Sequence, residues 1–188
     1  MKRIAIFVSG SGTNMENLIR KMQAGEIPAT PCLVISDNPQ AAAIEKAKKL
    51  SVPVEVVSRK QYSTKEIFEK EIIRHLENQK AELIALAGFM RILSLDFVKK
   101  YKGRIINIHP SLLPAFPGAH SIQDAFEAKV KETGVSVHFV DEGVDTGPII
   151  LQRKIPLDPA DTLESLEAKI HAVEYALYPE ALRRILSI

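Results

Sequence analysis

The first part of the chain alternates between short apolar runs and longer segments with helical periodicity. Residues 4–8 are a continuous apolar run, typical of a strand buried on both faces, and mainly apolar stretches predict further strands at residues 32–35, 54–57, 83–87 and 104–109. Apolar residues at helical spacing predict helices over residues 15–22, 37–50 and 65–79 and a short helix after Ser94. This alternation of strands and helices predicts a parallel sheet with right-handed crossovers.

The second part of the chain follows a different pattern. Residues 134–140 alternate between two faces and, with residues 148–155, predict an antiparallel strand pair. A helix is expected after His120, and the last helix begins with a capping pattern at 161–164 and is broken or kinked by Pro179. We therefore expect one domain over residues 1–188, an α/β fold of the doubly wound, Rossmann-like type with an antiparallel C-terminal strand pair.

Composition and charge narrow the class of protein. The chain has 188 residues with a net charge of +2, from 25 basic and 23 acidic residues, which favours neither a nucleic-acid nor a membrane partner. Its one cysteine, Cys32, lies in an apolar run and is expected to be a buried structural thiol. Because no targeting segment or run of membrane-spanning length is visible, a cytoplasmic location is predicted.

A glycine-containing segment, Ser9–Asn14, separates the first apolar run from the first helix. Such a turn presents backbone N–H groups at a helix N-terminus, which favours an anion. The segment lacks the lysine of a Walker A loop, and Met15 stands where a dinucleotide fingerprint has its third glycine. It predicts a phosphate site with side-chain contacts from Thr13 and Asn14. An ordinary turn in which Thr13 caps the helix is the alternative.

The strongest candidate chemistry lies at the end of the run 104–109. Asn107 and His109 are two residues apart on a strand, so their side chains project from the same face, just before Pro110 ends the strand. The alternative is a core histidine bonded to a backbone carbonyl. Asp145 lies in a glycine-containing loop that is placed to reach the same edge of the sheet, and a carboxylate beside an imidazole favours the imidazolium and fixes its tautomer.

Other kinds of site find little support in the sequence. None of the five histidines has metal-ligand spacing, and no nucleophile elbow surrounds Ser111. What remains is an amide donor for a developing oxyanion, Asn107, beside a proton carrier, His109. This pair fits addition to a carbonyl without a covalent enzyme intermediate and without a metal.

Several stretches in register resemble the signature of the folate-dependent formyltransferases, and they span nearly the whole chain: residues 106–114 with 116–118, 9–14, 87–93, and 136–140 with 145–148. The resemblance implies a formyltransferase fold and 10-formyltetrahydrofolate as cosubstrate, with no metal. It also implies transfer of the formyl group to the amino group of a phosphoribosylglycinamide in purine synthesis, by direct attack of the amine.

The same resemblance implies a role for individual residues. Asn107 would stabilise the oxyanion, His109 would be the general acid, and Asp145 would raise the pKa of His109 and orient it. The phosphate and ribose would be bound by Gly12, Thr13, Asn14 and Glu174. The folate would be bound by Lys65, Met90, Arg91, Ile92, Leu93, Asn107, Asp141 and Val144. The partners would be small molecules, and the protein a monomer or a homodimer.

The sequence departs from the family pattern at two positions of interest. Lys65 stands where relatives can carry an arginine, and His171 stands where some carry a glutamine near the substrate. Three other activities stay open: a deformylase that uses water as acceptor, a transferase that acts on methionyl-tRNA, and a binding protein without catalysis. The short, nearly neutral chain disfavours the tRNA-binding alternative.

Overall fold

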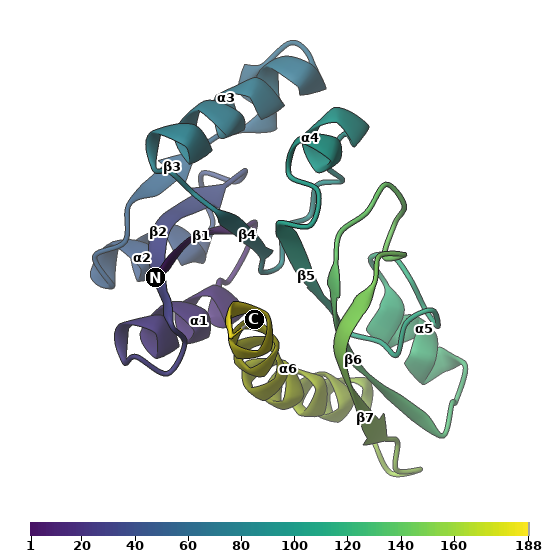
Figure 1. The fold of residues 1–188 in the computed structure, drawn as a ribbon. Coiled ribbons are helices and arrows are strands. Elements are labelled where there is room, and N and C mark those ends of the chain that lie inside the picture. The colour runs from purple at the N-terminus through teal and green to yellow at the C-terminus, as the bar shows by residue number, and fades with distance from the viewer. Residues whose placement is uncertain (188) are drawn as a thin grey trace.

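A seven-stranded sheet with the strand order β3-β2-β1-β4-β5-β6-β7 forms the centre of the computed structural model, which describes residues 1–187 (Figure 1). Strands β1 to β5 are parallel, whereas β6 runs antiparallel to β5 and β7 antiparallel to β6. The predicted fold class is therefore confirmed. The strands are β1 (Lys2–Val8), β2 (Ala29–Ser36), β3 (Val54–Val56), β4 (Leu83–Leu86), β5 (Ile105–His109), β6 (Glu132–Phe139) and β7 (Ile149–Pro156).

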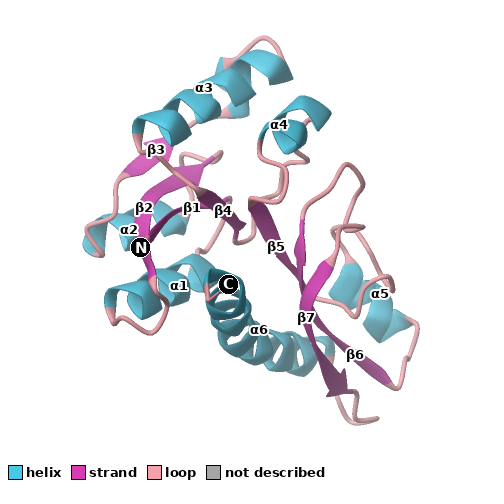
Figure 2. Ribbon diagram, viewed as in Figure 1, coloured by secondary structure: helices cyan, strands magenta, loops and turns pink. Residues whose placement is uncertain are grey.

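Helices cover both faces of the sheet (Figures 1 and 2). One face is packed by α1 (Thr13–Gln23), α2 (Ala42–Lys49), α5 (Ser121–Glu127) and α6 (Leu163–Leu186), and the other by α3 (Lys65–Asn78) and α4 (Leu95–Lys100), with a short 3-10 turn at Arg59–Gln61. Successive residues of β1 point to opposite faces, so Ile4 and Ile6 join one core while Ala5 and Phe7 join the other. This double burial explains why β1 reads as an unbroken apolar run.

Two helix starts differ from the predicted ones. The helix expected from residue 37 begins at Ala42, because the side chain of Asn38 accepts a hydrogen bond from the Gln40 N–H and donates to the Ser9 carbonyl, which holds a turn. The capping pattern of α6 is formed by Thr162 and Ser165, one residue later than predicted. Asn and Thr side chains compete for nearby backbone groups, so pattern alone places such boundaries poorly.

Pro179 does not end the last helix, and the predicted break is wrong, because α6 continues from Leu163 to Leu186. The neighbouring Tyr178 is fully buried, and its hydroxyl donates to the carbonyls of Leu86 in β4 and Ile106 in β5. Burial raises the pKa of the Tyr178 hydroxyl well above its ordinary value. The sheet therefore anchors α6 at the point where proline would otherwise favour a break.

The order of the strands reverses between β1 and β4, because the chain runs outward to β2 and β3 on one side and to β5 on the other. In open α/β sheets, ligands bind in the crevice outside the carboxyl ends of the strands at such a switch point. The segment after β1, the segment after β4 and the end of β5 all meet there. Within residues 1–187, no helix is long and apolar enough to cross a lipid bilayer.

Candidate active site

A cavity of about 630 Å³ opens at the carboxyl ends of β1, β4 and β5. It brings together the predicted site residues Gly12, Thr13, Asn14, Met90, Arg91, Ile92, Leu93, Asn107, His109, Asp141, Val144, Asp145 and Glu174. Lys65, the first residue of α3, is not among the residues that line it, and its contact with folate stays a prediction. Within residues 1–187, no group of three or more His, Cys, Asp and Glu side chains is placed to hold a metal ion.

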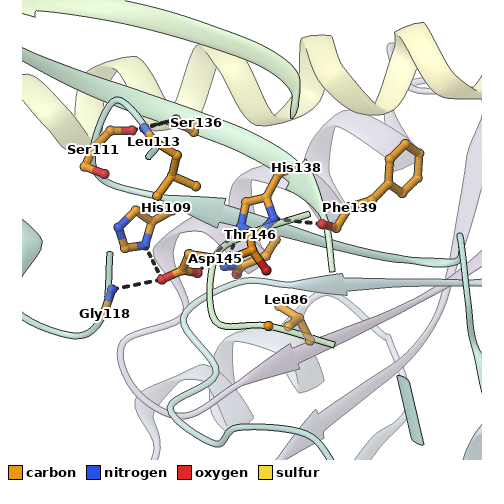
Figure 3. A network of polar contacts seen from close by, with 12 residues as sticks. Leu86, His109, Ser111, Leu113, Gly118, Ser136, His138, Phe139, Asp145 and Thr146 are labelled. Carbon is orange, nitrogen blue, oxygen red and sulfur yellow. Dashed lines mark hydrogen bonds and ion pairs between the residues drawn. The ribbon is translucent and has the colours of Figure 1, made fainter. Parts of the chain in front are cut away.

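Asp145 lies between two histidines, His109 and His138, and all three line this cavity (Figure 3). Its carboxylate is 3.4 Å from Nδ1 of His109 and 3.7 Å from Nε2 of His138, and it accepts a hydrogen bond of 2.9 Å from the Gly118 N–H. The hydrogen bond with His138, the Gly118 N–H and the charge of His109 lower the pKa of Asp145 to about 2, against the opposing effect of burial. The carboxylate is therefore ionised at any physiological pH.

The ring of His109 is buried and bonded on both sides. Its Nε2 lies 2.8 Å from the carbonyl oxygen of Phe116, and because a carbonyl only accepts, Nε2 carries a proton and donates it. Its Nδ1 faces the Asp145 carboxylate. A proton on Nδ1 makes that contact attractive. The backbone hydrogen bond expected of a core histidine is present, but it accompanies a carboxylate and an open cavity.

His138 is a site residue that the sequence analysis missed. It sits directly opposite Asn107 in the β5–β6 ladder, and its Nε2 is 3.3 Å from the Asn107 Nδ2. Its Nδ1 lies 2.8 Å from the Phe139 carbonyl and so donates to it. The contact between Nε2 of His138 and Nδ2 of Asn107 orients the amide, whose second N–H can meet a ligand.

The signal that finds His138 is strand pairing. Opposite residues of an antiparallel ladder project from the same face. The sequence analysis paired residues 134–140 only with 148–155, whereas the structure also pairs them with β5. Adding that pairing places an imidazole next to Asn107.

The segment after β1 forms the start of α1. Gly12 is the N-cap of this helix with φ +69°, and a Cβ there would approach the Cβ of Ala43 to 2.5 Å, so only glycine fits. Thr13 is the first helical residue, and the alternative in which it caps the helix is wrong. Because no side chain caps this helix, its first N–H groups remain available to an anion.

A polar cluster on α1 and α6 lies beside this helix start. Oε2 of Glu174 accepts from Nδ2 of Asn14 at 3.0 Å and contacts Nδ1 of His171 at 2.9 Å. The buried Oδ1 of Asn14 has no hydrogen-bond partner within residues 1–187. A buried acceptor without a partner is costly, so this corner of the cavity is suited to an N–H or O–H donor of a ligand.

The ion pair between His171 and Glu174 is expected to make the free energy of unfolding depend on pH. The hydrogen bond with Glu174 raises the pKa of His171 above the ordinary value of 6.5. A group whose pKa is raised by folding stabilises the fold below its unfolded pKa, and this contribution is lost as pH rises through the folded pKa. We expect His171→Gln to lower the free energy of unfolding most near about pH 6 and progressively less at alkaline pH.

Urea unfolding of the wild type and His171→Gln across this pH range measures the effect. The side chain is half exposed, so solvent screening keeps the effect modest. A difference between the two proteins that does not change with pH would show that the ion pair with Glu174 contributes nothing.

The segment Gly88–Leu93 is held in place by residues that the sequence analysis did not select. Asp37, which is buried, accepts from Ser9 Oγ at 2.6 Å and pairs with Arg91 Nε at 2.7 Å. Ser9 Oγ in turn accepts from the Met90 N–H at 2.8 Å. Side chains that directly follow β1 and β2 thus fix the near end of the segment.

The far end of the segment is fixed from α3. The buried carboxylate of Glu69 accepts from the Ser94 N–H at 2.7 Å and from the Ser94 hydroxyl. Between these anchors the side chains of Met90 and Ile92 remain mostly exposed, at 73% and 68%. Two exposed apolar side chains beside a cavity suit an apolar or aromatic ligand surface.

The doubly wound α/β fold and this cavity belong to a known class. The model of the formyl transferase family matches residues 2–182, and the chain therefore belongs to the formyl transferase family. It is 45% identical to the phosphoribosylglycinamide formyltransferase of Bacillus subtilis (strain 168), over all of this chain and 96% of that protein. The crystal structure of phosphoribosylglycinamide formyltransferase from Bacillus halodurans superposes with a TM-score of 0.96 at 48% identity and covers 99% of this chain and 96% of that one.

A longer relative also matches. The trifunctional purine biosynthetic protein adenosine-3 of Drosophila pseudoobscura pseudoobscura is 45% identical over 188 residues, which are 99% of this chain but 14% of that protein. The chain therefore corresponds to one part of that protein.

Proposed function

We propose that this protein transfers the formyl group of 10-formyltetrahydrofolate to the amino group of phosphoribosylglycinamide in purine synthesis. One observation carries the proposal: a single cavity joins an uncapped helix N-terminus, suited to a phosphate, to an amide and a carboxylate-paired imidazole. The full-length similarity to proteins named for this activity supports it. Formyl transfer requires proximity, oxyanion stabilisation and proton transfer, and this cavity offers groups for each.

The phosphate and the N–H groups at the start of α1 form one end of the proposed complex. Thr13 adds a hydroxyl at the same helix start, and the unpartnered Oδ1 of Asn14 and the carboxylate of Glu174 accept from the donors of the sugar or the glycinamide. This arrangement points the amino group along the cavity toward Asn107.

Asn107 and His109 act on the reacting atoms. The amine attacks the formyl carbon, a new C–N bond forms, and the carbonyl oxygen becomes an oxyanion that accepts from the second N–H of Asn107. The bond from this carbon to the folate nitrogen then breaks as His109 gives a proton to the departing nitrogen, and the proton that the former amine loses returns the His109 ring to its charged form. Asp145 stays ionised and stabilises the imidazolium before the proton moves.

The folate lies between two segments of the chain. The apolar side chains of Met90 and Ile92 and the main chain up to Leu93 contact one side of its ring system. Asp141 and Val144 form the opposite side. The loop that carries them is held by Asp141 Oδ1, which accepts from the Gly143 N–H at 3.0 Å and from Thr146 Oγ1 at 2.6 Å. Arg91 acts through its ion pair with Asp37, and Lys65 meets the acidic tail of the folate outside the cavity.

A single assay tests the proposed activity. The protein is mixed with 10-formyltetrahydrofolate, with and without glycinamide ribonucleotide, and the deformylated folate is followed by absorbance. We expect turnover only when the ribonucleotide is present. Equal turnover without it identifies a deformylase, and no turnover in either mixture identifies a binding protein. Formylation of methionyl-tRNA in a parallel reaction would identify the third alternative.

Asp37→Asn tests how Gly88–Leu93, the segment proposed to contact the folate (the folate segment), is held in place. Asparagine keeps an oxygen for Ser9 but removes the charge that pairs with Arg91, and a lost charge-assisted hydrogen bond of this kind changes an equilibrium by roughly tenfold or more. We expect the KM for 10-formyltetrahydrofolate to rise by that order, with a smaller change in the KM for the ribonucleotide.

Steady-state kinetics with each substrate varied in turn measures both constants. Glu82→Gln is the matched control, since Glu82 forms an exposed ion pair with Lys2 at 3.0 Å on the outer surface. Parallel rises in both KM values after Asp37→Asn would contradict a role specific to the folate segment.

A further inference from the structure

Helices α1 and α6 are joined by a hydrogen bond that the proposed chemistry does not use. Nδ2 of Asn17 in α1 donates to the carbonyl oxygen of Tyr175 in α6 at 2.9 Å. Tyr175 directly follows Glu174, which belongs to the polar cluster at the ribonucleotide end of the cavity. The bond therefore lies next to a residue that faces the substrate.

The need for this bond arises from Pro179. In an α-helix, the carbonyl of residue i accepts from the N–H of residue i+4, and for Tyr175 that residue is Pro179, which has no N–H. Asn17 supplies a donor to this carbonyl from a different helix. The sequence of α6 thus leaves an acceptor open on the side that faces α1, and a side chain of α1 meets it.

Asn14 and Asn17 are three residues apart on α1 and so lie on neighbouring positions of one helix face. Asn14 contacts Glu174, and Asn17 contacts the backbone of the next residue of α6. Of these two contacts, only that of Asn14 lines the main cavity. The second contact lines a separate, smaller pocket and joins α6 to α1.

We propose that Asn17 is a positioning residue for the ribonucleotide: it holds α6 at Tyr175 so that Glu174 stays against Asn14. This inference rests on the proposed function, because it assigns that cluster to the ribonucleotide. The folate segment is held by Asp37 and Glu69, which belong to other elements. Loss of the Asn17 contact therefore affects one substrate and spares the other.

Asn17→Ala tests the proposal. Removing the donor leaves a part-buried carbonyl without its partner, an effect of roughly tenfold on an equilibrium constant. We expect the KM for glycinamide ribonucleotide to rise by about that factor, while kcat and the KM for 10-formyltetrahydrofolate change less than about twofold. Gln23→Ala is the matched control, because Gln23 is also on α1 and its Nε2 donates to a carbonyl, that of Leu50, at 2.7 Å.

Pro179→Ala provides a second, sharper comparison. It restores a backbone N–H that satisfies the Tyr175 carbonyl within α6 but makes no contact with α1. We therefore expect Asn17→Ala to raise the ribonucleotide KM in the Pro179→Ala background as well. A rise that disappears in that background, a rise shared by the folate KM, or no rise in the wild-type background would overturn the proposal.

Calorimetric binding of glycinamide ribonucleotide separates this inference from the proposed activity. Affinity needs no turnover, so a wild type that binds the ribonucleotide but transfers no formyl group refutes the activity alone. In that case a roughly tenfold loss of affinity in Asn17→Ala that persists in the Pro179→Ala background still supports the positioning role. A wild type that does not bind the ribonucleotide would overturn both.

Discussion

His109→Ala is expected to lower kcat by about 10²–10⁴-fold, the range that a positioned general acid contributes. The departing folate nitrogen is a poor leaving group until it is protonated, and His109 is the proton carrier next to Asn107 at the end of β5. Its Nε2 donates to the Phe116 carbonyl, and its Nδ1 faces the ionised Asp145. The His109→Ala variant has no proton donor at this position but keeps the proposed phosphate site at the start of α1.

The distinguishing measurement is a comparison of turnover with affinity. Stopped-flow or steady-state kinetics gives kcat, and calorimetry gives the affinity for glycinamide ribonucleotide, which we expect to change less than about threefold because the substrate contacts lie on α1 and α6. His75→Gln is the control, since His75 in α3 contacts Glu71 at 3.0 Å and does not line the cavity. Near-normal kcat in His109→Ala would assign the proton to another group.

Much of the fold could be predicted from the sequence, because the buried positions of strands and helices are occupied by apolar residues at regular spacing. Strands such as β1, which contribute to a core on each face, read as unbroken apolar runs, and α1 presents its apolar side at helical spacing. The prediction failed at boundaries that side chains decide. Asn38 folds back onto the backbone and delays α2, and the buried Tyr178 keeps α6 intact at Pro179. Such effects depend on partners distant in the sequence.

The candidate site was predictable to a different extent. Asn107 and His109 share one strand, and a single strand has a known side-chain period, so they could be paired from the sequence. His138 required the register between β5 and β6. Asp37 and Glu69 accept hydrogen bonds from Ser9 and Ser94, and these bonds hold the segment Gly88–Leu93 in place. No local sequence motif marks either acid. Residues that touch the substrate were therefore easier to find than residues that hold them in place.

The position of Asp145 between two imidazoles makes its charge the second decisive feature of the site. Asp145→Asn is an appropriate test, because Asp145 has φ +55° and asparagine tolerates this left-handed conformation as well as aspartate does. The substitution therefore keeps the shape of the loop and removes the charge. We expect kcat to fall about 10²–10⁴-fold, because the neutral amide no longer favours the imidazolium of His109.

The same variant changes stability in a predictable direction with pH. The pKa of Asp145 falls from an ordinary 3.8 to about 2, so its contribution of about 2 kcal/mol is present above about pH 4 and is lost as pH falls toward 2. Asp145→Asn is expected to lower the free energy of unfolding by about that amount at neutral pH and by progressively less in acid. Denaturant unfolding at several pH values measures this.

Asp161→Asn is the matched control, because it tests whether the loss of an ion-paired carboxylate outside the cavity also lowers kcat. Asp161 also has a pKa of about 2, because Lys169 and the Asp158 N–H contact it at the start of α6, away from the cavity. We expect Asp161→Asn to leave kcat unchanged, whereas Asp145→Asn loses most of its turnover. Near-full activity in Asp145→Asn would contradict the proposed charge pairing with His109, even if stability fell as expected.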